Sequence, residues 1–120
     1  MYTFDMKFLF LLAAAATATA NQFTFSGPPA YFHSTSMMTI SYTASGFTGT
    51  AVGGFSCFHN TSGSPTAFTT WTASIVPGSG TTSHAVPGLV CQTKDFCSAV
   101  LQINGGAINL EGNSPPIVCI

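Results

Sequence analysis

Charge is what this 120-residue sequence has least of, since Asp, Glu, Lys and Arg together make up 4% of it. There is no arginine, and the two lysines are Lys7 and Lys94. Nucleic acid is excluded as a partner, because phosphate binding requires clustered Lys or Arg. Attachment to an anionic membrane surface is excluded for the same reason. Disorder is disfavoured too, because aromatic residues are plentiful and the net charge is near zero.

A long hydrophobic run is also absent. The apolar run 8–16 has about half of the roughly 20 residues that a membrane-spanning helix needs. It follows Lys7, and the small residues Ala18, Thr19 and Ala20 come after it. This order predicts a secretory signal peptide over residues 1–20, with translation starting at Met1 or Met6. A single secreted domain of residues 21–120 follows.

All four cysteines, Cys57, Cys91, Cys97 and Cys119, lie in the predicted secreted domain. An even number in an oxidising compartment predicts two disulfides, for which three pairings are possible. We expect Cys91 to pair with Cys97 across a local loop, and Cys57 with Cys119. No two cysteines have the C-x-x-C spacing of a zinc knuckle, so no metal site is predicted.

Serine and threonine supply the polarity that charge does not. The predicted secreted domain has 27 of them, and 24 lie between Thr24 and Ser83. Their hydroxyls keep a surface hydrated without charge. Asn60-Thr61-Ser62 is an acceptor sequence for N-glycosylation, which predicts that Asn60 lies at the surface.

The periodicity after residue 20 is that of strands. In segments 38–43 and 70–75, apolar residues alternate with Ser and Thr, as in a strand with one buried face. Frequent Gly-Pro and Ser-Gly turn signals separate the candidate strands. We therefore predict an all-β fold, a small disulfide-bonded antiparallel sandwich or barrel of about seven to eight short strands. The other candidate strands are 23–25, 52–58, 84–91, 99–103, 107–110 and 117–120.

One hairpin is predicted in detail. With Gly105-Gly106 as its two-residue turn, Ile103 faces Ile108 and Leu101 faces Leu110. A turn at Asn104-Gly105 would instead place Ile103 opposite Gly106, so packing favours the glycine pair.

The sequence has few residues that could act in catalysis. Asp95 and Glu111 are the only carboxylates of the predicted domain, whereas a glycosidase needs two that flank a cleft. Asp95, beside Lys94, is expected to be a solvated loop charge, and Glu111 the polar end of a strand. A Ser-His-Asp triad would have to use Asp95, and no Gly-x-Ser-x-Gly elbow is present. We predict that the protein is not an enzyme, has no catalytic residue and uses no cofactor.

Histidines and aromatic residues offer two further possibilities. His33, His59 and His84 lack the two- or four-residue spacing that would place two of them on one face, so surface or half-buried positions without a metal are expected. Trp71, Tyr31 and Tyr42 could form a sugar-stacking platform. The alternation of Trp71 with polar neighbours favours the core for that ring.

The leader 6–12, the Ala/Thr run after it and the Ser/Thr/Gly-rich remainder are similar to small secreted cysteine-containing proteins of fungi, many of them effectors or surface antigens. Four motifs carry a closer resemblance: Phe23-Thr24-Phe25, Phe55-Ser56-Cys57, Trp71, and the cysteine pair enclosing Lys94-Asp95-Phe96. In these positions the sequence partially resembles the Alternaria major-allergen-like β-barrel family. The resemblance implies a disulfide-bonded β fold and an infection or surface context, and it transfers no binding residue.

These observations favour a non-enzymatic, effector or virulence-related protein that binds a host or surface target in the host apoplast or at the fungal cell surface. Without charge to steer association, binding would use backbone edges, hydroxyls and aromatic side chains. The alternative is a cell-wall or extracellular-matrix protein with weak, lectin-like carbohydrate binding. A small secreted hydrolase or metal-dependent oxidase is a minor alternative.

Overall fold

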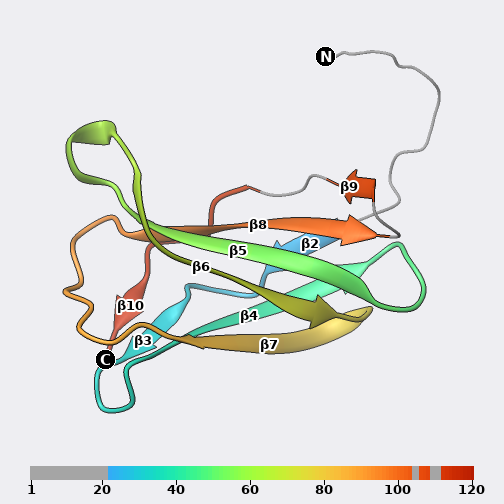
Figure 1. Ribbon diagram of the computed structural model, residues 1–120, viewed down its shortest axis with the longest axis horizontal. Helices are drawn as coiled ribbons and strands as arrows, with labels where there is room; N and C mark the ends of the chain where they lie inside the picture. The colour runs from blue at the N-terminus through green and yellow to red at the C-terminus, as the bar shows by residue number, and fades with distance from the viewer. Residues whose placement is uncertain (1–21, 104–105, 109–111) are drawn as a thin grey trace.

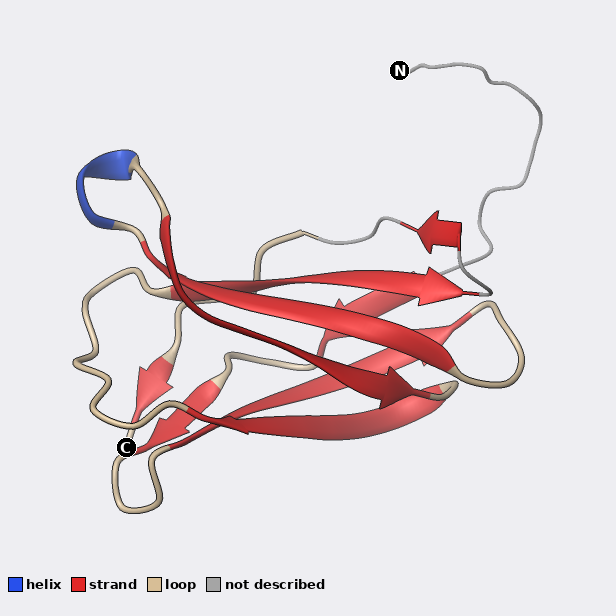
Figure 2. Cartoon of the chain, in the orientation of Figure 1, coloured by secondary structure: helices blue, strands red, loops and turns tan. Residues whose placement is uncertain are grey.

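Two β-sheets pack face to face in the computed structural model, which describes residues 22–103, 106–108 and 112–120 (Figure 1). Within the described ranges, the only helical element is one short 3-10 turn, η2 (Thr61–Gly63), at the tip of the connection between β5 (Ala51–His59) and β6 (Thr66–Ile75) (Figure 2). No helix among these residues is long and apolar enough to cross a membrane. The elements are β2 (Gln22–Phe25), β3 (Ala30–Phe32), β4 (Met37–Ser45), β5 (Ala51–His59), η2 (Thr61–Gly63), β6 (Thr66–Ile75), β7 (Gly78–Ala85), β8 (Phe96–Ile103), β9 (Gly106–Ile108) and β10 (Val118–Cys119).

The larger sheet has five strands arranged around β4. Strand β7 pairs with β4 along one edge, from Met37 opposite Ala85 to Ala44 opposite Gly78. On the other edge, β3 pairs with the first part of β4 and β2 with the last part. The short β10 extends this sheet beyond β3. The second sheet has the order β6-β5-β8-β9 and is antiparallel throughout.

The predicted all-β fold with two disulfides is confirmed, and its form is an open sandwich and not a closed barrel. The strand pairs in the described ranges are antiparallel, as predicted, apart from β10, which runs parallel to β3. The strand predicted at 84–91 is wrong, because β7 covers Gly78–Ala85 and Pro87 lacks the N–H that a ladder position would donate. Strand β3 was not predicted, since three residues are too few to show alternation.

The β8–β9 hairpin has a register different from the predicted one. Leu101 pairs with Ile108 and Ile103 with Gly106, so the connecting residues are 104–105, which lie outside the described ranges together with Leu110. The predicted turn at Gly105-Gly106 is wrong, because Gly106 pairs with Ile103 in the strand ladder.

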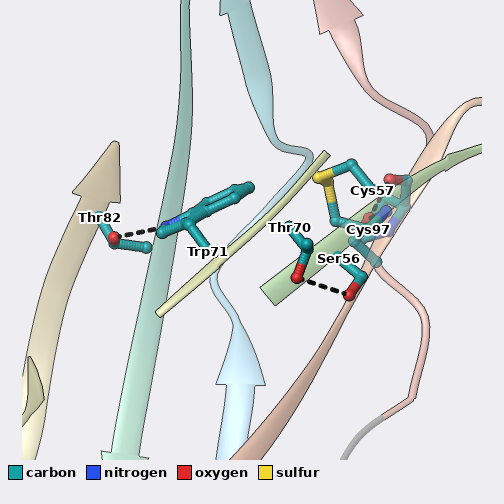
Figure 3. The surroundings of a disulfide bond; sticks show 8 residues. Ser56, Cys57, Thr70, Trp71, Thr82 and Cys97 are labelled. Atoms are coloured by element: carbon teal, nitrogen blue, oxygen red, sulfur yellow. Dashed lines mark hydrogen bonds between the residues drawn. A yellow bond between two sulfur atoms is a disulfide. The ribbon is translucent and has the colours of Figure 1, made fainter. Parts of the chain in front are cut away.

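The core between the sheets is built by the predicted alternation. Met38 and Ile40 of β4 are fully buried, and so is Phe55 of β5. The Phe55 ring stacks on that of Trp71 with centroids 5.4 Å apart. The Trp71 indole Nε1 donates a hydrogen bond of 3.0 Å to Thr82 Oγ1 (Figure 3). Since Trp71 belongs to β6 and Thr82 to β7, this bond links the edges of the two sheets.

The disulfides join Cys57 to Cys97 and Cys91 to Cys119, so the expected pairing is wrong. Cys57 and Cys97 lie directly opposite each other on β5 and β8 and are fully buried (Figure 3). Cys91, in the loop between β7 and β8, ties that loop to β10. The sequence proximity of Cys91 and Cys97 was misleading, because Cys97 belongs to a strand whose register places it against Cys57.

Gly80 makes room for a neighbouring aromatic ring. It pairs with Tyr42 across β7 and β4, and a Cβ at this position would lie 2.7 Å from the Tyr42 hydroxyl oxygen. We therefore expect Gly80→Ala to lower the free energy of unfolding by about 1–3 kcal/mol, measured by urea denaturation. Gly54→Ala is the matched control, because its Cβ would meet only a backbone oxygen at 3.9 Å. Equal stabilities of the two variants would contradict this prediction.

Candidate functional site

The outer face of the five-stranded sheet is covered by hydroxyl side chains. Alternation along β4 points Met38, Ile40 and Tyr42 into the core and leaves the intervening Ser and Thr residues on the other side. On β7, Thr82 points inward and its neighbours point outward. We call the resulting set the hydroxyl array; its members are Thr24, Ser26, Thr39, Ser41, Thr43, Ser79, Thr81 and Ser83.

Register brings the members of the hydroxyl array into rows across the strands. Thr39 lies opposite Ser83, and their oxygens are 2.9 Å apart. The Thr43 hydroxyl is 3.3 Å from that of Ser26 and 3.5 Å from that of Ser79. Rows repeat about every 6.7 Å along a strand, and neighbouring strands are about 4.8 Å apart. Because each hydroxyl has one donor and two acceptor positions, these pairings leave capacity for an external partner.

One end of the same face is apolar. Phe32 is 37% exposed, and Val118 and Ile120 are exposed by 46% and 62%. Phe32 pairs with Met37, which is half-buried, and Val118 pairs with Ala30. We call Phe32, Met37, Val118 and Ile120 the apolar end, and the hydroxyl array with the apolar end the contact face.

The contact face carries no charged side chain. Within the described ranges, Lys94 is the exposed residue with a full charge, and it lies in the loop between β7 and β8. Glu111 is outside the described residues. A surface of this kind suits a neutral partner, because no side chain on it loses the hydration of a charge on binding.

Asp95 is buried, with 1% exposure, and the expectation of a solvated loop charge is wrong. Its Oδ1 lies 3.0 Å from His59 Nδ1, and its Oδ2 accepts a 2.9 Å hydrogen bond from the Gln92 backbone N–H. Its backbone carbonyl accepts a 2.8 Å bond from Ile117 N–H. Asp95 therefore holds together the end of β5, the β7–β8 loop and the segment before β10.

His59 also lines an open cleft of about 330 Å³, together with Phe68, Gln92 and residues 86–90. The His59 ring packs on Phe68 with centroids 4.5 Å apart. A histidine oriented by an aspartate is the base of a Ser-His-Asp triad, but none of the residues that line this cleft carries a hydroxyl or thiol nucleophile. The geometry assigns this pair an anchoring role.

The three aromatic residues considered for sugar stacking lie in the core. Trp71 is 8% exposed, Tyr42 6% and Tyr31 1%, and the Tyr31 hydroxyl donates to the Val86 carbonyl oxygen at 2.6 Å. Their faces are not available to a sugar, and the core interpretation of Trp71 applies. The exposed aromatic ring on the contact face is Phe32. Adjacent residues of a strand point to opposite faces, so a sequence that places Tyr31 in the core also indicates that Phe32 points outward.

The remaining predicted residues are two histidines and the asparagine of the glycosylation sequence. His33 is exposed, whereas His84 is half-buried and stacks on Trp71 with centroids 4.9 Å apart. Asn60 is half-buried, and it precedes an exposed stretch, residues 61–67.

No protein-family model matches the chain, and searches of curated proteins and of solved structures find nothing similar.

Proposed function

We propose that the protein is secreted and acts without catalysis, binding neutral polysaccharide of a cell wall or extracellular matrix through its contact face. The observation that carries the proposal is the uncharged hydroxyl array on one open sheet face. The leader pattern and two disulfides support an extracellular location, because disulfides persist in oxidising compartments.

The energetics favour a polymer over a single sugar. One hydroxyl hydrogen bond contributes only about 0.5–1.5 kcal/mol net, so a monosaccharide would bind weakly. A chain lying across several rows of the array makes such bonds repeatedly, and linked contacts raise the overall affinity. The exposed Phe32 ring adds an apolar surface for a pyranose face.

Ser41→Lys tests this proposal at the centre of the array. Ser41 is exposed and lies opposite Thr81, so a lysine there is tolerated by the fold and places an ammonium group beneath the bound polymer. We expect retention on glucan, chitin or mannan to fall at least about tenfold, which corresponds to roughly 1.4 kcal/mol. Retention is measured by depletion from solution over a range of polysaccharide concentrations.

Thr72→Lys is the matched control, because Thr72 is exposed on β6 of the other sheet. It adds the same charge without touching the contact face, and it should leave retention unchanged. Equal retention by wild type and both variants, or equal loss in both, would argue against the hydroxyl array as the binding surface.

The apolar end favours a second function, that of an effector binding a host protein in the apoplast. Phe32, Val118 and Ile120 are exposed side by side, as in the apolar centre of a protein–protein contact. The resemblance to small secreted fungal proteins supports the same role. In this case Phe32→Ala should abolish capture of one defined apoplastic protein, quantified by mass spectrometry, while polysaccharide retention stays weak in the wild type. Unchanged host colonisation after gene deletion would count against this function.

A further inference from the structure

Three potential metal ligands meet at the end of the sandwich where β3 and β10 pair. One ring nitrogen of His33 and the Sγ atoms of Cys91 and Cys119 all lie within 4.8 Å of one another. His33 is exposed, and the two cysteines are half-buried. The His33 N–H donates a 3.0 Å hydrogen bond to the Ile120 carbonyl, which keeps His33 beside the strand that carries Cys119.

We propose that reduction of the Cys91–Cys119 disulfide converts this cluster into a Zn²⁺ site. Two equivalents of a small thiol supply two electrons and two protons: the S–S bond breaks, two cysteine thiols form, and the small thiol leaves as its own disulfide. Zinc then displaces the two thiol protons to solvent and is bound by two thiolates and the neutral His33 imidazole. The oxidised protein has no thiolate to offer and does not form the site.

The geometry requires the two sulfur atoms to move apart once their bond is broken. With Zn–S near 2.3 Å and Zn–N near 2.0 Å, tetrahedral ligand atoms lie roughly 3.5 Å apart, and a ring nitrogen of His33 already lies within 4.8 Å of both sulfur atoms. The Cα atoms of Cys91 and Cys119 are 6.6 Å apart, so two thiolates can reach one ion once they are no longer bonded to each other. Two thiolates and one imidazole leave a fourth position open for water or a small ligand, as in zinc sites of the Cys₂His type.

The other disulfide is protected from the same reductant. Cys57 and Cys97 are 0% exposed inside the sandwich, whereas Cys91 and Cys119 are partly accessible. Exchange requires a thiolate to reach a sulfur atom, so mild reduction should open Cys91–Cys119 first. The fold would then keep its central disulfide while the zinc ligands become free. This site could not be predicted from the spacing of its ligands, because residues 33, 91 and 119 are far apart in the sequence.

The test is a zinc titration of selectively reduced protein. The full secreted chain is treated anaerobically with a small monothiol, desalted and checked by alkylation and mass spectrometry for thiols at Cys91 and Cys119 only. Zn²⁺ is then titrated in competition with a chromophoric chelator. We expect one zinc per reduced chain and none per oxidised chain. His33→Ala should weaken binding at least about tenfold, since loss even of a group that only supports a ligand costs 10–100-fold.

Two controls distinguish a built site from nonspecific metal uptake. His84→Ala removes an imidazole outside the cluster and should bind zinc as the wild type does. Cys91→Ser/Cys119→Ser should bind none above background. The proposal is overturned if the reduced wild type binds zinc no more tightly than this double variant, or if His33→Ala binds equally well. If reduction loosens the fold, zinc must restore the native Trp71 fluorescence; failure to do so also overturns it.

Discussion

Cys57→Ala/Cys97→Ala is expected to lose about 4 kcal/mol of unfolding free energy, the largest effect among the variants considered. The bond closes a loop of sequence separation 40, and losing it returns that loop's conformational entropy to the unfolded chain. Urea denaturation of both proteins under oxidising conditions measures the difference. A loss this large is a substantial part of the 5–15 kcal/mol that stabilises a typical domain.

Cys91→Ala/Cys119→Ala is the matched control, because its loop has sequence separation 28. The entropy term depends only logarithmically on loop length, so on this basis alone the two losses should be within about 0.5 kcal/mol of each other. The Cys57–Cys97 pair is also fully buried, and its removal leaves unfilled space in the core. The central pair should therefore cost more than the control. A loss below about 1 kcal/mol would show that neither mechanism operates there.

The fold could be predicted from the sequence where local pattern and tertiary packing agree. Met38, Ile40 and Tyr42 alternate with hydroxyl residues, and all three are buried on the inner face of β4. Trp71 follows the same rule on β6. In each case a period of two distinguishes inside from outside without knowledge of any partner strand.

What could not be predicted depends on which strands are neighbours. The hydroxyl array depends on pairs such as Thr39 with Ser83, which join strands about 40 residues apart in the sequence. Composition therefore predicted a surface rich in hydroxyl groups, but it could not predict that they gather on one face of one sheet. Cys97 lies against Cys57 because β8 pairs with β5. The charge of Asp95 suggested solvent, but its partners His59 and Gln92 come together only in the folded chain.

Asp95→Ala is expected to lower the free energy of unfolding by about 3 kcal/mol. The substitution leaves the Gln92 N–H without its acceptor and removes the partner of the His59 Nδ1, both in a partly buried setting. Groups deprived of a partner away from water lose more free energy than a solvent-exposed bond contributes. Lys94→Ala, at the exposed neighbouring position, should change stability by less than about 0.5 kcal/mol.

Asp95→Asn separates hydrogen bonding from charge at the same place. The amide oxygen can still accept from Gln92 N–H, and the amide nitrogen can donate to His59 Nδ1 if the imidazole carries its proton on Nε2. We therefore expect Asp95→Asn to lose roughly half as much stability as Asp95→Ala, because both contacts remain but without a charged acceptor. If Asp95→Ala and Lys94→Ala were equally stable in urea, Asp95 would be an ordinary loop residue, and the cleft beside His59 would lack the anchor that positions its walls.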